Sequence, residues 1–142
     1  TVMALGGNEM VKQAKKAANE LDPSIKVLAV TILTSLAKNE LSEMGFNSSV
    51  EDTVAQLAKN SSEADGYVCS ALEAKLLREK VSRDKLIFCP GIRMLGDSKN
   101  DQVRSASPAL ALKNGADACI MGRSLLQGDV DKNLEKVLNS IK

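Results

Sequence analysis

The sequence alternates five short apolar runs with longer amphipathic segments, and this alternation restricts the possible folds more than any other feature. The runs are residues 1–5, 26–33, 66–69, 86–89 and 118–121. Most are apolar at nearly every position, which is typical of parallel strands covered on both faces. The segments between and after them carry apolar residues at helical spacing, most clearly Val130, Leu134 and Leu138. Five β-then-α units predict an α/β fold with a parallel sheet, either an open doubly wound sheet or part of a (β/α)8 barrel.

Capping residues indicate where several helices begin. The pairs that fit a capping box are Ser48 with Glu51 and Ser70 with Glu73. Ser107 followed by Pro108 fits an N-cap with proline at the first helical position, and Gly115 fits the end of that helix. A short internal echo, EADGYVCSALEAKLL from residue 63 and GADACIMGRSLL from residue 115, is consistent with a repeated β/α unit.

Composition excludes several classes of function. The 142 residues fit one domain, and a formal net charge of +1 gives no global field to attract a nucleic acid or an anionic membrane. Aromatic residues make up 2%, too few for the stacking platforms of single-stranded nucleic-acid binders. The absence of histidine excludes hydrolases with a His base and His-ligated metal centres. No apolar stretch reaches the roughly 20 residues of a membrane span. We predict a soluble, cytoplasmic protein that binds neither nucleic acid nor membrane.

The three cysteines, Cys69, Cys89 and Cys119, lack CxxC spacing and each lies inside an apolar run. This usage suits a reducing compartment, and we interpret them as buried small hydrophobic residues. A three-cysteine metal site on neighbouring strands is the alternative, but buried inert cysteine is much more common. We therefore predict no metal site at these cysteines.

Polar and glycine-containing segments follow the ends of the predicted strands, at the edge where both candidate folds bind ligands. Gly122 and Arg123 follow the last strand, so backbone N–H groups and a guanidinium could meet a phosphate there; a glycine turn with a solvated arginine is the alternative. The segment 90–108 is longer than a β/α connection needs, which favours a functional loop over a disordered excursion. No GxGxxG follows the first strand and no GxxxxGK[ST] occurs. Asp65 and Asp117 precede strands and are expected at the opposite, stabilising end.

Five β/α units are too few for an eight-stranded barrel, which typically needs about 250 residues. An open arc of five strands would leave two bare edges and an uncovered interior, which favours association. We therefore expect residues 1–142 to be a fragment, a partial barrel domain that pairs with a missing amino-terminal segment or with another chain.

The order of motifs resembles orotidine 5'-phosphate decarboxylases of the bacterial type. The matching motifs, in chain order, are LAVTILTSL from residue 28, ADGYVCSALEA from 64, PGIR from 90, DQVR from 101, SP from 107 and GADACIMGR from 115. The resemblance covers essentially the whole chain and implies a (β/α)8 TIM barrel, of which this chain supplies the fourth to eighth strands. It also implies conversion of orotidine 5'-phosphate (OMP) to UMP without a cofactor, and a homodimer.

The resemblance assigns substrate-binding roles to five residues: Thr34, Arg93, Gln102, Gly122 and Arg123. Thr34 would contact the nucleotide near the pyrimidine. Arg93 and Gln102 would lie on the loop that covers the ligand, with Gln102 bridging toward the 5'-phosphate. The Gly122 backbone and the Arg123 side chain would hold that phosphate. Asp97 and Asp101 are expected to be solvated loop charges, or partners of Lys99 and Arg104.

Some positions depart from the family pattern. Met3 stands where His is usual, Met94 and Ser124 where Pro is common, Asn100 where GDQ has Gly, and Ser107 where TP has Thr. The larger departure is that no part of the chain matches the family's catalytic Asp-x-Lys-x-x-Asp motif, so no catalytic residue can be named and the chain alone is expected to be inactive. Two alternatives stay open: a non-catalytic phosphate-binding half-barrel that pairs with another chain, and a related barrel decarboxylase acting on sugar phosphates.

Overall fold

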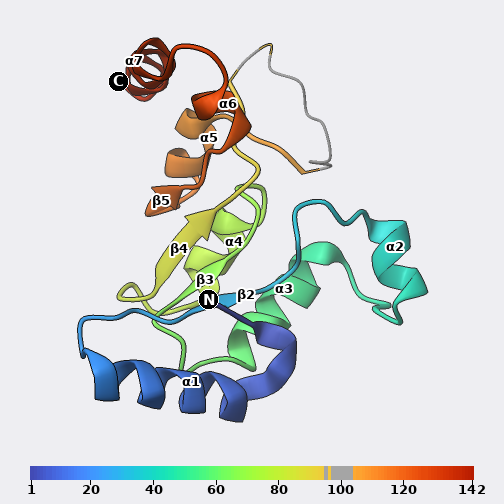
Figure 1. The fold of residues 1–142 in the computed structure, drawn as a ribbon. Coiled ribbons are helices and arrows are strands. Elements are labelled where there is room, and N and C mark those ends of the chain that lie inside the picture. Colours follow the sequence, from blue (N-terminus) through green and yellow to red (C-terminus); the bar gives the residue numbers. More distant parts are fainter. Residues whose placement is uncertain (95, 97–103) are drawn as a thin grey trace.

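The computed structural model describes residues 1–94, 96 and 104–142. Its five strands are β1 (Val2–Met3), β2 (Leu28–Val30), β3 (Gly66–Val68), β4 (Leu86–Cys89) and β5 (Ala118–Cys119). They form one sheet in chain order, and every neighbouring pair is parallel (Figure 1). Each strand lies inside a run that the sequence predicted. This confirms the expected parallel α/β architecture.

Helices connect and follow the strands. They are α1 (Gly7–Leu21), α2 (Lys38–Glu43), α3 (Val50–Lys59), α4 (Ala74–Lys80), α5 (Pro108–Lys113), α6 (Arg123–Leu126) and α7 (Val130–Ser140), and a 3-10 turn (Ala4–Gly6) precedes α1. The core contains Val11 of α1, Val54 of α3 and Leu77 of α4, each at most 1% exposed. The amphipathic segments therefore pack their apolar faces together as their spacing predicts.

Register explains which face of the sheet meets these helices. Ala29, Tyr67 and Ile87 pair across β2, β3 and β4, and all three side chains are buried in the core cluster. In the next row, Val30 and Phe88 are only half-buried, while Val68 between them is 8% exposed. Because successive residues of a strand point to opposite faces, the first row faces the helices and the second row faces the uncovered side.

The starts of α5 and α3 show the predicted serine capping, the second with a shift of one residue. Ser107 Oγ accepts a hydrogen bond from the backbone N–H of Leu110, as expected for the N-cap of α5. The N-cap of α3 is Ser49 and not the predicted Ser48; its Oγ accepts from the Asp52 N–H at 3.0 Å. Ser49 with Asp52 has the same serine-to-acid spacing as Ser48 with Glu51, so the sequence pattern did not distinguish the two serines.

The beginnings of β3 and β5 are closed by two aspartates. Asp65 accepts a hydrogen bond from the Val27 N–H at 2.9 Å through its carboxylate, and its own N–H donates to the Val27 carbonyl at 2.8 Å. Asp117 makes the same two bonds with Ile87, at 2.7 and 2.8 Å. The aspartate in each repeated Ala-Asp pair therefore has a structural role: it bonds the start of its own strand to the neighbouring strand. Both aspartates lie at the end of the sheet opposite the candidate site, as the sequence predicted.

Several apolar side chains stay exposed. The stripe of α7 includes Val130, Leu134 and Leu138, which are 42%, 44% and 48% exposed. The helix forms where the sequence predicted it, and these three side chains stay partly exposed although α7 contacts α5 and α6. Within the described ranges, no helix has the length and apolarity needed to cross a bilayer.

Candidate functional site at the carboxyl ends of the strands

Three of the predicted ligand residues occupy equivalent places in the fold. Thr34, Arg93 and Arg123 each lie four positions after the last residue of a strand, which is Val30, Cys89 or Cys119. Because the strands are parallel, these positions follow the same edge of the sheet. The fourth side-chain candidate, Gln102, lies outside the described residues.

Thr34 is 6% exposed, and its carbonyl oxygen accepts from the backbone N–H of Arg104 at 3.1 Å. Arg93 is 8% exposed; its N–H donates to the Ala106 carbonyl at 2.9 Å, beside an isolated parallel bridge between Ile92 and Ala106. The two residues are thereby connected through the short segment 104–106. Through these two backbone hydrogen bonds, the segment holds Thr34 and Arg93 near each other at the carboxyl ends of the strands.

The guanidinium of Arg93 is incompletely used within the described structure. One terminal nitrogen donates to the Ile92 carbonyl at 2.9 Å, while Nε is buried without a hydrogen-bond partner among the described residues. A buried, unsatisfied N–H on a cation is costly, and an anionic or carbonyl ligand would relieve that cost. The chemistry of Arg93 therefore suits a ligand contact.

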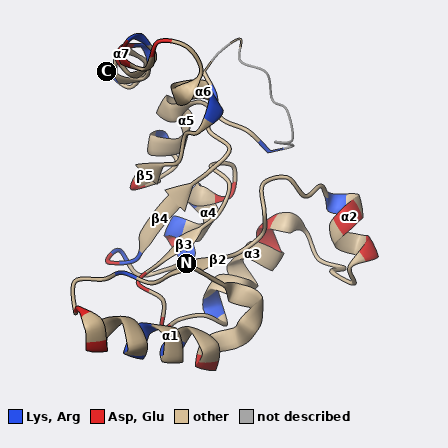
Figure 2. Cartoon of the chain, viewed as in Figure 1, with Lys and Arg blue, Asp and Glu red and all other residues tan. Residues whose placement is uncertain are grey.

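Gly122 and Arg123 begin α6, a single helical turn. A Cβ built at Gly122 would meet no other atom within 4 Å, so the backbone here is open to an approaching group. Arg123 is exposed. Figure 2 shows basic positions at the start of α6 and where the described chain resumes after the grey segment, while acidic and basic positions intermix on the helices. Basic residues therefore occur at this edge, while the described surface as a whole mixes both signs of charge.

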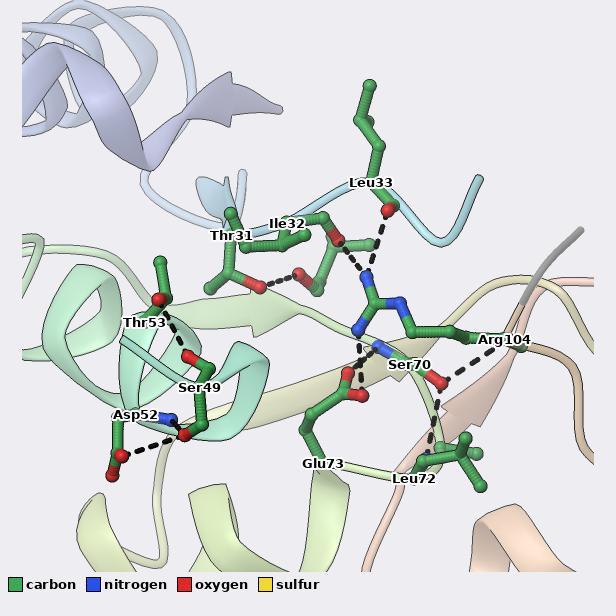
Figure 3. A network of polar contacts seen from close by, with 12 residues as sticks. Thr31, Ile32, Leu33, Ser49, Asp52, Thr53, Ser70, Leu72, Glu73 and Arg104 are labelled. Carbon is green, nitrogen blue, oxygen red and sulfur yellow. Dashed lines mark hydrogen bonds and ion pairs between the residues drawn. The ribbon is translucent and has the colours of Figure 1, made fainter. Parts of the chain in front are cut away.

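A buried ion pair lies next to Thr34 and Leu33 at this edge of the sheet. A terminal nitrogen of Arg104 lies 2.7 Å from a Glu73 carboxylate oxygen, and the two side chains are 10% and 2% exposed. The other terminal nitrogen donates to the Leu33 carbonyl at 2.8 Å, and a longer contact of 3.4 Å reaches Ile32 (Figure 3). Burial raises the pKa of Glu73, although the Arg104 guanidinium and a backbone N–H oppose that shift.

Ser70 completes the network. Its N–H donates to the Glu73 carboxylate at 3.0 Å, its Oγ donates to the Arg104 carbonyl at 3.3 Å, and that Oγ also accepts from the Leu72 N–H at 3.2 Å. The Glu73-to-Ser70 half of the predicted capping box is therefore present, but α4 itself begins at Ala74. These bonds account for Ser70 as a structural residue.

Sequence analysis missed the importance of Glu73. The chain's motif signalled only a helix cap, and the expected partners of Arg104 were Asp97 or Asp101, which lie outside the described residues. The structure places Glu73 against Arg104 instead. The available signal was a glutamate directly after an apolar strand and turn, where a carboxylate has to be buried and therefore requires a cationic partner.

The cysteines form a row on neighbouring strands. Cys69 and Cys89 are buried, as predicted, and Cys119, paired in register with Cys89, is half-buried. A hydrogen bond to Cys89 and burial raise the pKa of Cys69, and burial raises that of Cys119, so neither is an activated thiolate. No cluster of three or more His, Cys, Asp or Glu side chains suited to a metal occurs among residues 1–94, 96 and 104–142.

Comparison with known proteins gives a consistent result. Residues 1–136 match the family described as Orotidine 5'-phosphate decarboxylase / HUMPS. The chain is 42% identical over 126 residues to the orotidine 5'-phosphate decarboxylase of Nitrosomonas eutropha and 43% identical over 129 residues to that of Fusobacterium nucleatum. These matches cover 87% and 88% of this chain but 54% of each relative, so the chain spans about half the length of the curated relatives it matches.

A solved structure shows the same relationship in three dimensions. The crystal structure of orotidine 5'-phosphate decarboxylase from Lactobacillus acidophilus superposes with a TM-score of 0.80 and 33% sequence identity, over 100% of this chain and 63% of that one. The parallel sheet and its edge of polar residues therefore define part of a (β/α)8 barrel. The chain belongs to the Orotidine 5'-phosphate decarboxylase / HUMPS family.

Proposed function

We propose that this chain is the nucleotide- and phosphate-binding part of a complete barrel that converts OMP to UMP and CO2, a step of pyrimidine biosynthesis. The observation that carries the proposal is the family match over residues 1–136, supported by the relatives named as decarboxylases. The common placement of Thr34, Arg93 and Arg123 after strand ends agrees with it.

In this proposal each residue has a separate task. Thr34 contacts the nucleotide near its pyrimidine, and Arg93 and Gln102 belong to the segment that covers the ligand. The open backbone at Gly122 and the guanidinium of Arg123 hold the 5'-phosphate. A charge-assisted guanidinium–phosphate contact is about twice as strong as a neutral hydrogen bond, which makes Arg123 the main anchor. Binding energy collected at the phosphate can stabilise the transition state at the distant reacting carbon.

The catalytic groups belong to the rest of the barrel. The sequence contains no Asp-x-Lys-x-x-Asp motif. We propose that the chain alone is inactive, and that the complete cytoplasmic protein, a homodimer, uses lysine and aspartate side chains without a metal or organic cofactor.

One observation favours a second candidate function, a non-catalytic phosphate-binding half-barrel that pairs with another chain. The face of the sheet that carries Val30 and Phe88 is only half-buried, and Met3, Leu33 and Ile120 are 40%, 48% and 46% exposed. A partner chain would cover such a surface as well as the rest of a barrel would.

The deciding experiment completes the barrel. The chain is joined to the part of the Nitrosomonas eutropha relative that it does not match, and OMP consumption is compared with that of the chain alone. The proposal expects turnover by the joined protein and none by the chain. Tight binding of UMP by a folded joined protein that never consumes OMP would instead support the second candidate. Tighter binding of a pentose phosphate than of UMP would contradict the nucleotide assignment and favour a related barrel decarboxylase that acts on sugar phosphates.

A further inference from the structure

One buried residue connects two of the segments assigned to the nucleotide. The N–H of Arg104 donates to the Thr34 carbonyl at 3.1 Å, and its side chain donates to the Leu33 carbonyl at 2.8 Å. Two residues later, the Ala106 carbonyl accepts from the Arg93 N–H at 2.9 Å. The segment 104–106 is therefore attached to the Thr34 side at one end and to Arg93 at the other.

The side chain of Arg104 is held from two opposite sides. Its guanidinium lies between the Glu73 carboxylate, at 2.7 Å, and the backbone carbonyls of Ile32 and Leu33, which follow β2, while its own carbonyl accepts from Ser70 Oγ (Figure 3). A lysine ammonium carries all its donors on one atom, whereas the planar guanidinium donates from separate nitrogens in a fixed geometry, so it spans a carboxylate and a carbonyl on opposite sides with less loss of freedom. These contacts fix the position of the segment 104–106 and also neutralise the buried charge of Glu73.

We propose that Arg104, held by Glu73, is a positioning residue that sets the separation between Thr34 and Arg93. The inference rests on the proposed function, because it matters only if both residues serve one ligand. A buried ion pair is weak evidence for stability, and conformational specificity is the role that this geometry supports. Arg104 touches no reacting group; it acts through the residues on either side of it.

The kinetic test uses the complete barrel with Arg104→Met, Glu73→Gln and both changes together. Displacement of a binding group by about 1 Å can cost on the order of 100-fold in rate, so Arg104→Met should lower kcat/KM for OMP by on the order of 100-fold. The double variant should be no worse than Arg104→Met, because the two side chains act as a unit. The advantage of OMP over orotidine, which lacks the 5'-phosphate, should shrink, because a nucleotide misaligned at Thr34 and Arg93 presents its phosphate less well to Gly122 and Arg123.

Arg78 provides a matched control at the opposite end of the sheet. It donates to the Lys85 carbonyl at 2.7 Å and the Gly115 carbonyl at 3.0 Å, and it pairs with Asp117. Arg78→Met should lower stability while leaving the OMP-to-orotidine ratio of kcat/KM unchanged. If Arg78→Met and Arg104→Met change that ratio equally, the positioning role is refuted and Arg104 is only structural.

A second readout does not depend on turnover. Arg104→Lys keeps the charge and the fold but loses the fork, so hydrogen exchange of the Arg93 amide should accelerate at least tenfold, and that amide should be unaffected in Arg78→Met. Unchanged exchange at Arg93 would overturn the inference even in an active enzyme. A wild-type barrel that shows this exchange pattern but consumes no OMP would instead overturn the proposed function.

Discussion

Replacing Gly66 with alanine should destabilise the sheet, although a glycine-to-alanine change without strain usually stabilises a protein. Gly66 lies in the central strand β3 and pairs with Leu28 on one side and Leu86 on the other. A Cβ at this position would contact the Leu86 carbonyl oxygen and would lie 2.7 Å from Leu86 Cβ and 2.9 Å from Leu28 Cδ2. A side chain can rotate away from such a contact, but a strand's carbonyl cannot move without disturbing the sheet.

The magnitude follows from three terms. Overpacking costs about 1–3 kcal/mol, and a backbone obstacle places Gly66→Ala at the upper end of that range. A shift of β4 would also weaken the hydrogen bond from the Leu86 N–H to the Asp65 carbonyl, now 3.0 Å long, at a cost of about 1 kcal/mol. Reduced freedom of the unfolded chain offsets about 0.4–1 kcal/mol. The net loss of unfolding free energy is about 3 kcal/mol.

Urea denaturation followed by far-ultraviolet circular dichroism measures this loss. Gly6→Ala is the control: Gly6 has helical φ and ψ of −70° and −7°, and its new Cβ would meet only the end of the flexible Met10 side chain. That control should change stability by less than about 1 kcal/mol. A Gly66→Ala protein whose unfolding midpoint equals or exceeds that of wild type would refute the steric argument.

Three further outcomes are expected. In the complete barrel, Arg123→Ala should remove about 2–5 kcal/mol of transition-state stabilisation by deleting the phosphate's partner; near-normal kcat/KM would refute the assignment. Asp65→Asn should lower stability by about 1 kcal/mol at neutral pH. Burial raises the pKa of Asp65, but the Val27 N–H and the Lys15 ammonium outweigh it and hold the pKa below its ordinary value. Its stabilisation is therefore present above the unfolded-state pKa and is lost as pH falls through the folded-state pKa, so urea titrations of the two proteins should converge in acid; divergence would contradict this sign. The chain alone should self-associate or bind a hydrophobic dye because of its exposed apolar face, and a dye-negative monomer by sedimentation would argue against that.

Most of the fold could be predicted from the sequence because local pattern and tertiary structure agree. The strands read as continuous apolar runs since both faces of a parallel strand are normally covered. Ser107 with Pro108 fixed the start of α5 because capping depends on adjacent backbone groups alone. Strand order was also predictable in its main feature, since consecutive β/α units place neighbours side by side.

What the sequence could not show depends on contacts between distant residues. The separation of Glu73 from Arg104 in the chain hides an ion pair that forms only when the end of β3 meets the segment after residue 103. The stripe of α7 predicts a helix but not its exposure, because periodicity reports which residues share a face and not what covers it. For the candidate site, the sequence predicted that Thr34, Arg93 and Arg123 follow strand ends. Which ligand atom each side chain contacts depends on a bound ligand and not on the local sequence pattern.

The two ends of the sheet use the same backbone chemistry for different purposes. At the beginnings of β3 and β5, Asp65 and Asp117 satisfy the N–H and carbonyl groups of neighbouring strands, so little hydrogen-bonding capacity remains for a ligand there. At the carboxyl ends, the Arg93 Nε stays unsatisfied among the described residues and the backbone at Gly122 stays open. Buried unsatisfied polar groups cost stability unless a partner satisfies them, and under the proposed function the ligand is that partner. In that proposal the buried Glu73–Arg104 pair holds the neighbouring segments in position until the ligand arrives.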